Sequence, residues 1–376
     1  MMTKSSKPVV TAVGDNPTPI WGMSNSERLR RLARAAKLEF SDGSVAGPRL
    51  IANCAFAFDP QLLRHMIAQP GAALLRNGRP VIAHAHSEEQ AAAVRRAAER
   101  DEPLAEDSGL KLIAYEDGFS LYNDQLRKRE TPFVMPLEPA TVAAIERASY
   151  YAAYKGVTDI LTKYLWPEWA LWLTRIAARI GMTPNMVTGI GALLCVAATF
   201  LFWRGDYWLG IAVALGFMVL DTVDGKLARC TITSSWWGNI FDHGIDLVHP
   251  PFWWYAWGVG LGAWGLALTP DWFWMVMGAI IAGYVVQRAI EGIFMRRFAM
   301  HIHVWEKADS DFRLITARRN PNMVILFVAL VLGRPDWGLV GVAAWTIISC
   351  AFHAVRLAQA ELRARQGNPI TSWLVG

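Results

Sequence analysis

Between Asp221 and Asp246 the chain reads DTVDGKLARCTITSSWWGNIFDHGID, which places four aspartates inside an otherwise apolar, membrane-type segment. Carboxylates are costly at membrane depth, and they usually mark a functional site there. Asp221 and Asp224 are three residues apart, so they share one face of a helix. Asp242 and Asp246 are four residues apart and share a face in the same way. Two facing helices can therefore direct all four carboxylates into one small volume.

The close spacing of these carboxylates predicts a bound metal. Unpaired anions at this range repel one another, and a multivalent cation is the simplest way to neutralise them. All-oxygen ligation suits a hard ion, so we expect Mg2+ or Mn2+. The alternative is a pair of helices whose acidic residues are satisfied by arginines. We favour the metal because acids inside a membrane are functional by default.

The full pattern, D-x2-D-G-x2-A-R-x8-G-x3-D-x3-D, resembles the signature of the CDP-alcohol phosphotransferase family. Its fixed positions are all filled, by Asp221, Asp224, Gly225, Ala228, Arg229, Gly238, Asp242 and Asp246. The resemblance implies an integral-membrane, metal-dependent transferase of phospholipid biosynthesis. Such an enzyme moves a substituted phosphate group from a CDP-alcohol to an acceptor hydroxyl and releases CMP.

The resemblance also implies a role for each position. Asp221, Asp224 and Asp242 are expected metal ligands for a pair of ions. Asp246 is the favoured general base for the acceptor hydroxyl and is also a candidate ligand. The expected nucleotide-binding residues are Gly225, Ala228, Arg229, Gly238, Asn185 and Thr188. Glycine and alanine would let a flat nucleotide or a partner helix come close, and the arginine can contact phosphate oxygens.

Asn185 and Thr188 belong to a Thr-Pro-Asn opening that predicts the start of a helix, because proline near a helix start supplies a favourable φ. In the family a similar opening lies beside the nucleotide pocket. Capping of the helix is the alternative role for these residues. Lys226 faces another side of its helix from the aspartates, and we expect it at the membrane surface.

Composition divides the chain into two parts. The whole chain is 53% hydrophobic, but residues 1–145 are polar and mixed. Apolar stretches at 187–203, 208–220, 241–266, 272–294, 323–332 and 339–355 predict a six-helix α-helical transmembrane bundle over residues 183–366. Residues 146–182 are expected to form juxtamembrane amphipathic helices, including one at 166–180. The bundle would be preceded by a cytoplasmic α/β domain.

Charge placement predicts the orientation. The loop 295–320 carries six basic residues, whereas the connections on the opposite side hold little beyond Arg204 and Arg334. Each of these two arginines has an acid nearby, Asp206 or Asp336. By the positive-inside rule, both termini and the active site lie on the cytoplasmic face of a bacterial inner membrane or its equivalent.

The first 145 residues predict a three-layer domain with a mostly parallel sheet. We expect strand, loop and helix over 8–38, a strand at 49–58, a helix at 59–68 and a hairpin with an Asn77-Gly78 turn over 71–85. The domain resembles nucleotidyltransferases that make CDP- or sugar-nucleotides. Residues 12–17, AVGDNP, lack the Gly-rich phosphate loop of those enzymes, so we read the domain as degenerate and non-catalytic. Regulation, dimer contacts and substrate docking are its candidate roles.

The acceptor is predicted to meet four arginines, Arg288, Arg313, Arg318 and Arg319. Inositol phosphate and glycerol phosphate are the candidate acceptors, and CDP-diacylglycerol is the favoured donor. Arg288 has an alternative partner in Glu291, three residues on, and the other arginines have a second reading as positive-inside anchors. A soluble CDP-inositol-type donor and a catalytically inactive membrane scaffold are the alternatives for function.

Several other classes are disfavoured. The net charge of +5 is modest and no basic run suggests nucleic-acid binding. A cation transporter would be expected to show inverted repeats, and none is visible. The N-terminus has no long apolar stretch, so no cleaved signal peptide is predicted. The expected partners are the CDP-alcohol donor, the alcohol acceptor and membrane lipids, with a homodimer implied by the family.

Overall fold

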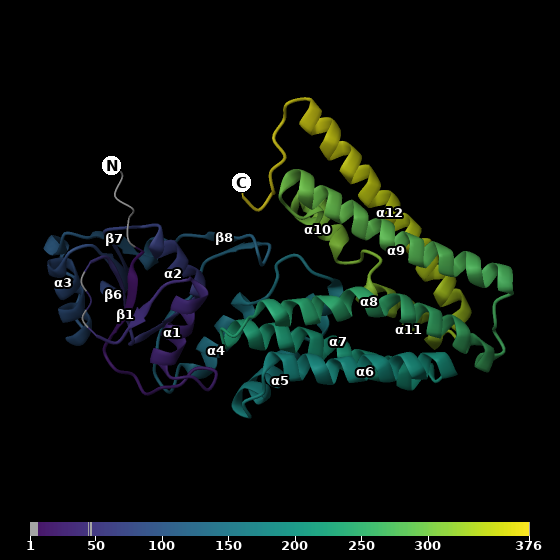
Figure 1. Ribbon diagram of the computed structural model, residues 1–376, viewed down its shortest axis with the longest axis horizontal. Helices are drawn as coiled ribbons and strands as arrows, with labels where there is room; N and C mark the ends of the chain where they lie inside the picture. Colours follow the sequence, from purple (N-terminus) through teal and green to yellow (C-terminus); the bar gives the residue numbers. More distant parts are fainter. Residues whose placement is uncertain (1–6, 44, 46, 376) are drawn as a thin grey trace.

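The computed structural model describes residues 7–43, 45 and 47–375. An N-terminal α/β domain and a C-terminal bundle of helices follow one another along the long axis of the molecule (Figure 1). This order confirms the predicted division into an α/β part and a helical part. The α/β part is called the front domain below.

The front domain is built on a six-stranded mixed sheet with the order β2-β1-β3-β6-β5-β7. Three of its strand pairs are parallel and two are antiparallel. The sheet is therefore less parallel than expected, because the predicted Asn77-Gly78 hairpin places β6 antiparallel to both of its neighbours. The strands are β1 (Val9–Val13), β2 (Phe40–Ser41), β3 (Arg49–Asn53), β5 (Ala72–Arg76), β6 (Arg79–Ala85) and β7 (Lys111–Ala114).

Helices cover both faces of this sheet and complete the three predicted layers. Helices α1 (Asn25–Ala35) and α2 (Pro60–Ile67) pack into one hydrophobic core, and α3 (Glu88–Glu99) packs into a second core on the other face. Each helix begins with a capping side chain, from Ser24, Asp59 and Ser87 respectively, as expected for residues that accept from a free N–H. The α1 and α2 side faces the bundle (Figure 1).

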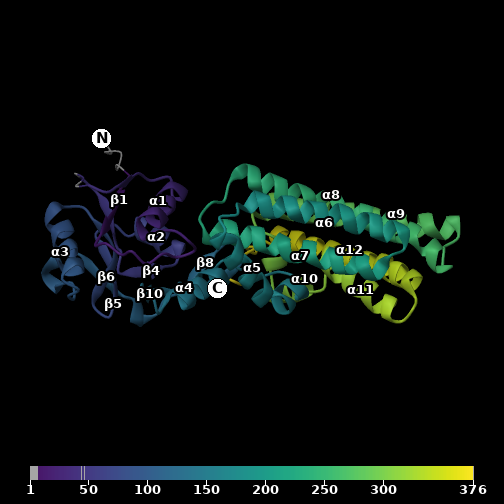
Figure 2. The same ribbon diagram turned by 90° about the horizontal axis from the view of Figure 1, so that it is seen from below.

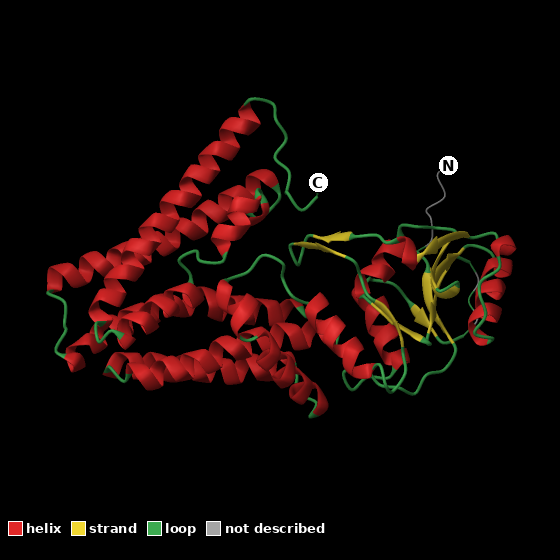
Figure 3. Ribbon diagram, turned by 180° about the vertical axis from the view of Figure 1, so that it is seen from behind, coloured by secondary structure: helices red, strands yellow, loops and turns green. Residues whose placement is uncertain are grey.

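Two small hairpin-like pairs extend the front domain. The segment expected as one strand at 49–58 is two strands, because the Asn53 side chain accepts a hydrogen bond from the Ala55 N–H (2.9 Å) and turns the chain. The second strand, β4 (Phe56–Phe58), pairs with β10 (Val134–Pro136). Strands β8 (Leu121–Asn123) and β9 (Lys128–Glu130) form a hairpin that reaches toward the C-terminal tail (Figure 3). Arg129 donates to the carbonyls of Leu374 and Val375 there.

The C-terminal part is helical throughout. Among the described residues, four helices are long and apolar enough to cross a membrane: α6 (Pro184–Arg204), α7 (Tyr207–Cys230), α9 (Pro270–Phe298) and α12 (Pro335–Arg365). The remaining helices are α4 (Val142–Ala152), α5 (Pro167–Arg179), α8 (Trp236–Gly260), α10 (Lys307–Arg313) and α11 (Arg319–Val331). The protein is therefore a multi-pass integral membrane protein, and the expected cut at residue 145 falls inside α4.

Helices α8 and α11 account for the difference between six expected spans and four. Helix α8 has 25 residues, but its two aspartates, two histidines and two prolines make it less apolar. Helix α11 has 13 residues and is about 20 Å long, shorter than a hydrocarbon core of about 30 Å. Both helices are present where apolar stretches were predicted, and their status as full spans stays a prediction.

The ends of α7 and α8 lie next to the front domain. Helices α6, α7 and α8 run side by side, and the front domain caps one end of them (Figure 2). Helix α5 packs against α7 with Ala170 and Leu171 buried, while Trp169 and Trp172 are exposed. Its predicted place along the membrane stays a prediction. The turn that joins α7 to α8, residues 231–235, therefore lies at the junction between the two parts.

Lys226 does not lie at the membrane surface. It is buried on α7, where its Nζ donates to the carbonyl of Ala153 (3.0 Å) and lies 3.1 Å from the centre of the Tyr154 ring. The expectation was wrong because the segment after α4 covers this side of α7. An aromatic ring and a carbonyl then take the place of water around the ammonium.

Candidate functional site

The four signature aspartates lie on the facing parts of α7 and α8. Carboxylate oxygens of Asp221, Asp242 and Asp246 lie within 4.8 Å of one another. Asp221 comes from α7, and the other two come from the first half of α8. The pattern predicted four carboxylates in one small volume, and three of them meet in this group. These three and Asp224 are called the acid-rich cluster below.

Asp224 is the fourth member of the acid-rich cluster and is the most buried, with 3% of its surface exposed. Its Oδ2 accepts a short hydrogen bond from the Thr188 hydroxyl (2.6 Å). Its Oδ1 is buried and has no hydrogen-bond partner. An unpartnered buried carboxylate oxygen is costly, and a hard cation satisfies such an atom. The all-oxygen donor set and this orphaned atom fit the expected divalent metal.

Arg319 lies between two of these carboxylates. Its NH2 donates to Asp221 Oδ2 (2.8 Å) and its NH1 donates to Asp246 Oδ1 (2.6 Å). One arginine thus bridges α7 and α8 from the first residue of α11. Arginine pairing accounts for half of the cluster. Among the described residues, Asp224 forms no salt bridge, and Asp242 forms one only with the neighbouring His243.

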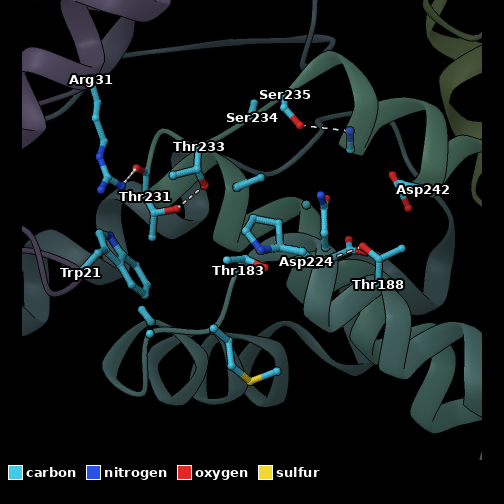
Figure 4. A pocket seen from close by; sticks show the side chains of 18 of the residues that line it. Trp21, Arg31, Thr183, Thr188, Asp224, Thr231, Thr233, Ser234, Ser235 and Asp242 are labelled. Atoms are coloured by element: carbon cyan, nitrogen blue, oxygen red, sulfur yellow. Dashed lines mark hydrogen bonds between the residues drawn. The ribbon is translucent and has the colours of Figure 1, made fainter.

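A cavity of about 430 Å³ leads to the acid-rich cluster and is lined by both Asp224 and Asp242. Five of the six residues predicted to bind the nucleotide line the same cavity, namely Asn185, Thr188, Gly225, Ala228 and Gly238. Figure 4 shows Asp224 and Thr188 on one side of this space, with Asp242 nearby. These five predicted residues come from three helices and meet at one cavity, called the donor cavity below.

The approach of α8 to α6 depends on the glycine at position 238. A Cβ atom there would lie 3.0 Å from Asn185 Oδ1 and 3.0 Å from Ser235 Oγ. Ser235 is the N-cap of α8 and accepts from the Gly238 N–H (3.0 Å). A side chain at this position would therefore push Asn185 away from the start of α8.

Arg229 lies behind the donor cavity. Its Nε donates to the Ala153 carbonyl (3.1 Å), and it lines a second cavity of about 230 Å³ between the front domain and the bundle. A Cβ atom at Gly225 would lie 3.0 Å from Arg229 NH2. The guanidinium thus packs over Gly225, and Gly225 lies between the guanidinium and the donor cavity that it lines.

The other predicted arginines lie near one glutamate, and two of them pair with it. The base-rich cluster is defined as Arg288, Glu291, Arg313 and Arg318. Glu291 accepts from Arg318 NH2 (2.5 Å) and pairs with Arg288 NH1 (3.2 Å), so the expected internal pair is present. Several guanidinium nitrogens in this cluster are buried without a partner: Arg288 Nε, Arg318 Nε, and Arg313 Nε and NH1.

Asp159 lies beside the base-rich cluster, in the segment before α5. It accepts from the Asn320 side chain (3.0 Å) and from the Thr162 N–H (3.0 Å). Burial acts to raise the pKa of Asp159, but the Arg313 charge and these hydrogen bonds outweigh it and hold the pKa below its usual value. Asp159 is therefore ionised and partly balances Arg313.

The front domain contributes residues that the motif could not reveal. Trp21, Gly22, Met23 and Arg31 line the donor cavity opposite the helices. They lie more than 150 residues before the nearest of their partners on α6, and no local pattern links the two segments. Covariation among related sequences is the signal that finds such contacts.

Comparison with known proteins agrees with the geometry. The model of the family described as CDP-alcohol phosphatidyltransferase matches residues 181–348, from just before α6 into α12. Cholinephosphotransferase 1 of Gallus gallus is 34% identical over 157 residues, which are 38% of this chain and 44% of that protein. Archaetidylinositol phosphate synthase of Pyrococcus horikoshii is 30% identical over 182 residues, 47% of this chain and 86% of that protein.

A solved structure is also similar, that of phosphatidylinositol phosphate synthase of Mycobacterium tuberculosis with CDP-DAG bound. It is 18% identical, and the match covers 50% of this chain and 92% of that chain with a TM-score of 0.37. The chain spans less than half the length of the cholinephosphotransferase, but most of the archaetidylinositol phosphate synthase. The family match includes the whole aspartate signature, and the archaetidylinositol phosphate synthase is similar over most of its length. The chain therefore belongs to the CDP-alcohol phosphatidyltransferase family.

Proposed function

We propose that the protein transfers a substituted phosphate group from a CDP-alcohol to an acceptor hydroxyl and releases CMP. The observation that carries this proposal is the donor cavity, at which predicted nucleotide-contacting residues and two of the four carboxylates meet. A second observation supports it: two adjacent residues at the start of α11 connect the clusters, since Arg318 pairs with Glu291 of the base-rich cluster and Arg319 with Asp221 and Asp246 of the acid-rich cluster. A cation site beside an anion site suits phosphate-group transfer.

Asp221, Asp224 and Asp242 are the proposed metal ligands, with Asp246 as a further one. Mg2+ or Mn2+, in one or two copies, would neutralise the charge of the pyrophosphate and polarise its phosphorus–oxygen bonds. Thr188 holds one oxygen of Asp224 by a hydrogen bond, which leaves the other oxygen of that carboxylate for the metal. This fixes the orientation of a ligand that lies deep in the cluster.

Asp246 is the proposed general base. Its side chain is 43% exposed, compared with 18% for Asp221, so it is the more accessible of the two carboxylates that contact Arg319. It would accept the proton of the acceptor hydroxyl as that oxygen forms its bond to the β-phosphorus. The bond from that phosphorus to the CMP oxygen breaks, and CMP leaves with the electron pair.

The nucleotide is proposed to lie in the donor cavity. Gly225 and Ala228 leave the α7 surface open there, and the side chains of Asn185 and Thr188 supply polar atoms on the facing helix. Arg229 would contribute charge from behind Gly225. Residues of the front domain and of the bundle both line the cavity. Since the front domain covers that end of the bundle (Figure 2), we expect the nucleotide to enter from the side on which that domain lies.

The base-rich cluster is the proposed acceptor site. Two of its arginines pair with Glu291, and the three arginines together keep four buried nitrogens without partners, so a phosphate group would gain hydrogen bonds that the protein does not supply. This favours a phosphorylated acceptor, such as inositol phosphate or glycerol phosphate, with CDP-diacylglycerol as donor. Arg319 lies at the boundary between this site and the acid-rich cluster.

A second candidate keeps the chemistry and exchanges the substrates. The similarity to cholinephosphotransferase 1 favours a soluble CDP-alcohol as donor, with a lipid hydroxyl as acceptor. The base-rich cluster argues against it, because a lipid hydroxyl carries no phosphate to pair with the arginines. In both candidates the active site is proposed to face the cytoplasm, and a homodimer is expected from the family.

CMP release by the full-length protein in detergent tests the proposal. The protein would receive CDP-diacylglycerol and Mg2+ or Mn2+, with inositol phosphate, glycerol phosphate, inositol and serine offered in turn. We expect CMP with one phosphorylated acceptor, and loss of that signal with EDTA. CMP from CDP-choline or CDP-inositol with diacylglycerol would select the second candidate. No CMP from any pair would contradict the proposed function.

A further inference from the structure

The donor cavity has a wall that does not belong to the transferase bundle. Trp21, Gly22 and Met23, from the loop between β1 and α1, and Arg31 of α1 line it. Trp21 and Arg31 lie on the side opposite Asp224 (Figure 4). We propose that the front domain supplies this wall as part of the nucleotide site: Trp21 packs against the nucleoside, and Arg31 positions the turn that closes the cavity. The inference rests on the proposed function, since it assumes that the cavity binds the donor.

Trp21 is held at the tip of a tight turn. The backbone N–H groups of Ile20 and Met23 each donate to the carbonyl of the other residue. The two residues between them, Trp21 and Gly22, have positive φ angles of 52° and 73°. Such turns favour Asn-Gly, and a bulky residue at positive φ is an outlier. An outlier of this kind persists where the surrounding structure holds it, and it often serves a function.

Two hydrogen bonds from α4 fix the tryptophan in place. The indole Nε1 donates to Ser149 Oγ (2.8 Å), and the Trp21 backbone N–H donates to Glu146 Oε1 (3.3 Å). Ile20, Trp21 and Met23 also belong to the same buried hydrophobic cluster as residues of α5 and α7. The aromatic wall is therefore rigidly attached to the bundle, as a preformed binding surface requires.

Arg31 acts on the turn between α7 and α8. Its Nε pairs with Glu27 (2.7 Å), and its NH1 donates to the carbonyl of Thr231, the residue after α7 (2.8 Å). Thr231, Thr233, Ser234 and Ser235 line the cavity, and the Thr231 and Thr233 hydroxyls are hydrogen-bonded (2.8 Å). Arg31 is thus a positioning residue: it holds the segment that links the two halves of the aspartate signature.

The phosphate loop of a working nucleotidyltransferase is not needed for this role. In the front domain the corresponding loop is tied down by Asn16, whose side chain donates to the carbonyls of Cys54 (3.1 Å) and Leu137 (2.9 Å). The part of this loop that faces the bundle is the Trp21-Gly22 turn. A domain without its own catalytic loop therefore still presents a surface to a nucleotide bound by its neighbour.

The test is CMP binding to the full-length protein, by calorimetry in detergent with Mg2+, together with kcat and KM for the donor. Trp21→Asn removes the ring and creates the Asn-Gly pair that the turn prefers, so this variant should fold. We expect its dissociation constant for CMP to rise about threefold to tenfold, since Trp21 is 3% exposed and contributes only part of its ring to the cavity wall. Arg31→Gln should raise it about threefold to tenfold, as for one lost hydrogen bond. In both variants KM should rise more than kcat falls.

Arg30→Gln is the matched control, because Arg30 is the neighbouring residue on α1 and pairs with Glu27 and Asp42 away from the cavity. CMP binding to this variant should match that of the wild type. Wild-type affinity in Trp21→Asn and Arg31→Gln, even with a lower unfolding temperature, would mean that the two residues only join the domains, and would overturn the inference. A wild-type protein that binds no CMP and releases none would instead overturn the proposed function and this inference with it.

Discussion

Two charged clusters in the helical part have opposite imbalances, although adjacent residues contribute to both. Arg319 contacts the acid-rich cluster, where it pairs with two of the four aspartates. Arg318 contacts the base-rich cluster, where Arg318 and Arg288 pair with Glu291 and Arg313 lies nearby. The acid-rich cluster leaves a buried carboxylate oxygen without a partner, and the base-rich cluster leaves buried guanidinium nitrogens without partners. Each cluster therefore lacks the charge that the other has in excess.

The difference shows how unpaired atoms indicate the sign of a ligand. A buried polar atom without a partner is costly, so its persistence points to a group that binds there. On this argument we propose that the acid-rich cluster binds a cation and the base-rich cluster binds an anion. Substitutions that shift the balance of one cluster should change the affinity for its own ligand and leave the other ligand unaffected.

The largest effect is expected from the aspartates themselves. Asp246→Asn should lower kcat by about 10²–10⁴-fold, because the general base is lost, while Mn2+ still binds. Asp224→Asn should instead raise the dissociation constant for Mn2+ by at least about 10–100-fold. Electron paramagnetic resonance of free Mn2+ and CMP release measure the two quantities. Normal activity in either variant would refute the assignment of these residues.

Arg318→Gln should weaken the acceptor and leave the metal unaffected. Loss of a hydrogen bond to a charged group costs about 1.5–3 kcal/mol, so KM for a phosphorylated acceptor should rise about 10–150-fold. Arg296→Gln, on the exposed end of α9, is the control for positive-inside anchoring. An equal rise in both variants would assign these arginines to anchoring rather than to the acceptor.

Arg319→Gln should have a smaller effect, and it should strengthen metal binding rather than weaken it. A divalent ion competes with Arg319 for Asp221 and Asp246, so its removal should tighten Mn2+ binding by about tenfold, as two charge-assisted hydrogen bonds cease to compete. In EDTA this variant should unfold at a lower temperature than the wild type, since the carboxylates lose their counter-charge. Weaker Mn2+ binding would mean that Arg319 orients the ligands.

The smallest effect is expected far from both clusters. Arg334 pairs with Asp336 at the start of α12 (2.6 Å), and half of its side chain is exposed. Exposed pairs contribute about 0–1 kcal/mol, so Arg334→Gln should leave CMP release and Mn2+ binding unchanged within error. A large change in either assay would show that the two clusters are not the only determinants of activity.

The sequence was most informative where function fixes residue spacing. The aspartate pattern predicted three carboxylates that lie within 4.8 Å of one another and three proposed nucleotide-binding residues, Gly225, Ala228 and Gly238, that line one cavity, because helical periodicity links spacing to position. The Asn77-Gly78 hairpin and the helix start at Thr183 followed from local turn and cap chemistry. These features depend on neighbours within a few residues.

Features that depend on distant neighbours were not predictable in the same way. The burial of Lys226 depends on Ala153 and Tyr154, and the bridge made by Arg319 depends on helices about 70–100 residues earlier. The wall formed by Trp21 depends on how the front domain docks. A single sequence carries no signal for such contacts, because propensity and periodicity describe one segment at a time.

The most direct test of the central claim is anomalous scattering from crystals of the protein grown with Mn2+ and CMP. The account predicts manganese peaks among Asp221, Asp224, Asp242 and Asp246, with the Asp224 Oδ1 atom bound to an ion and CMP in the donor cavity. An active protein whose crystals show no manganese there, with Arg319 still bridging Asp221 and Asp246, would contradict it.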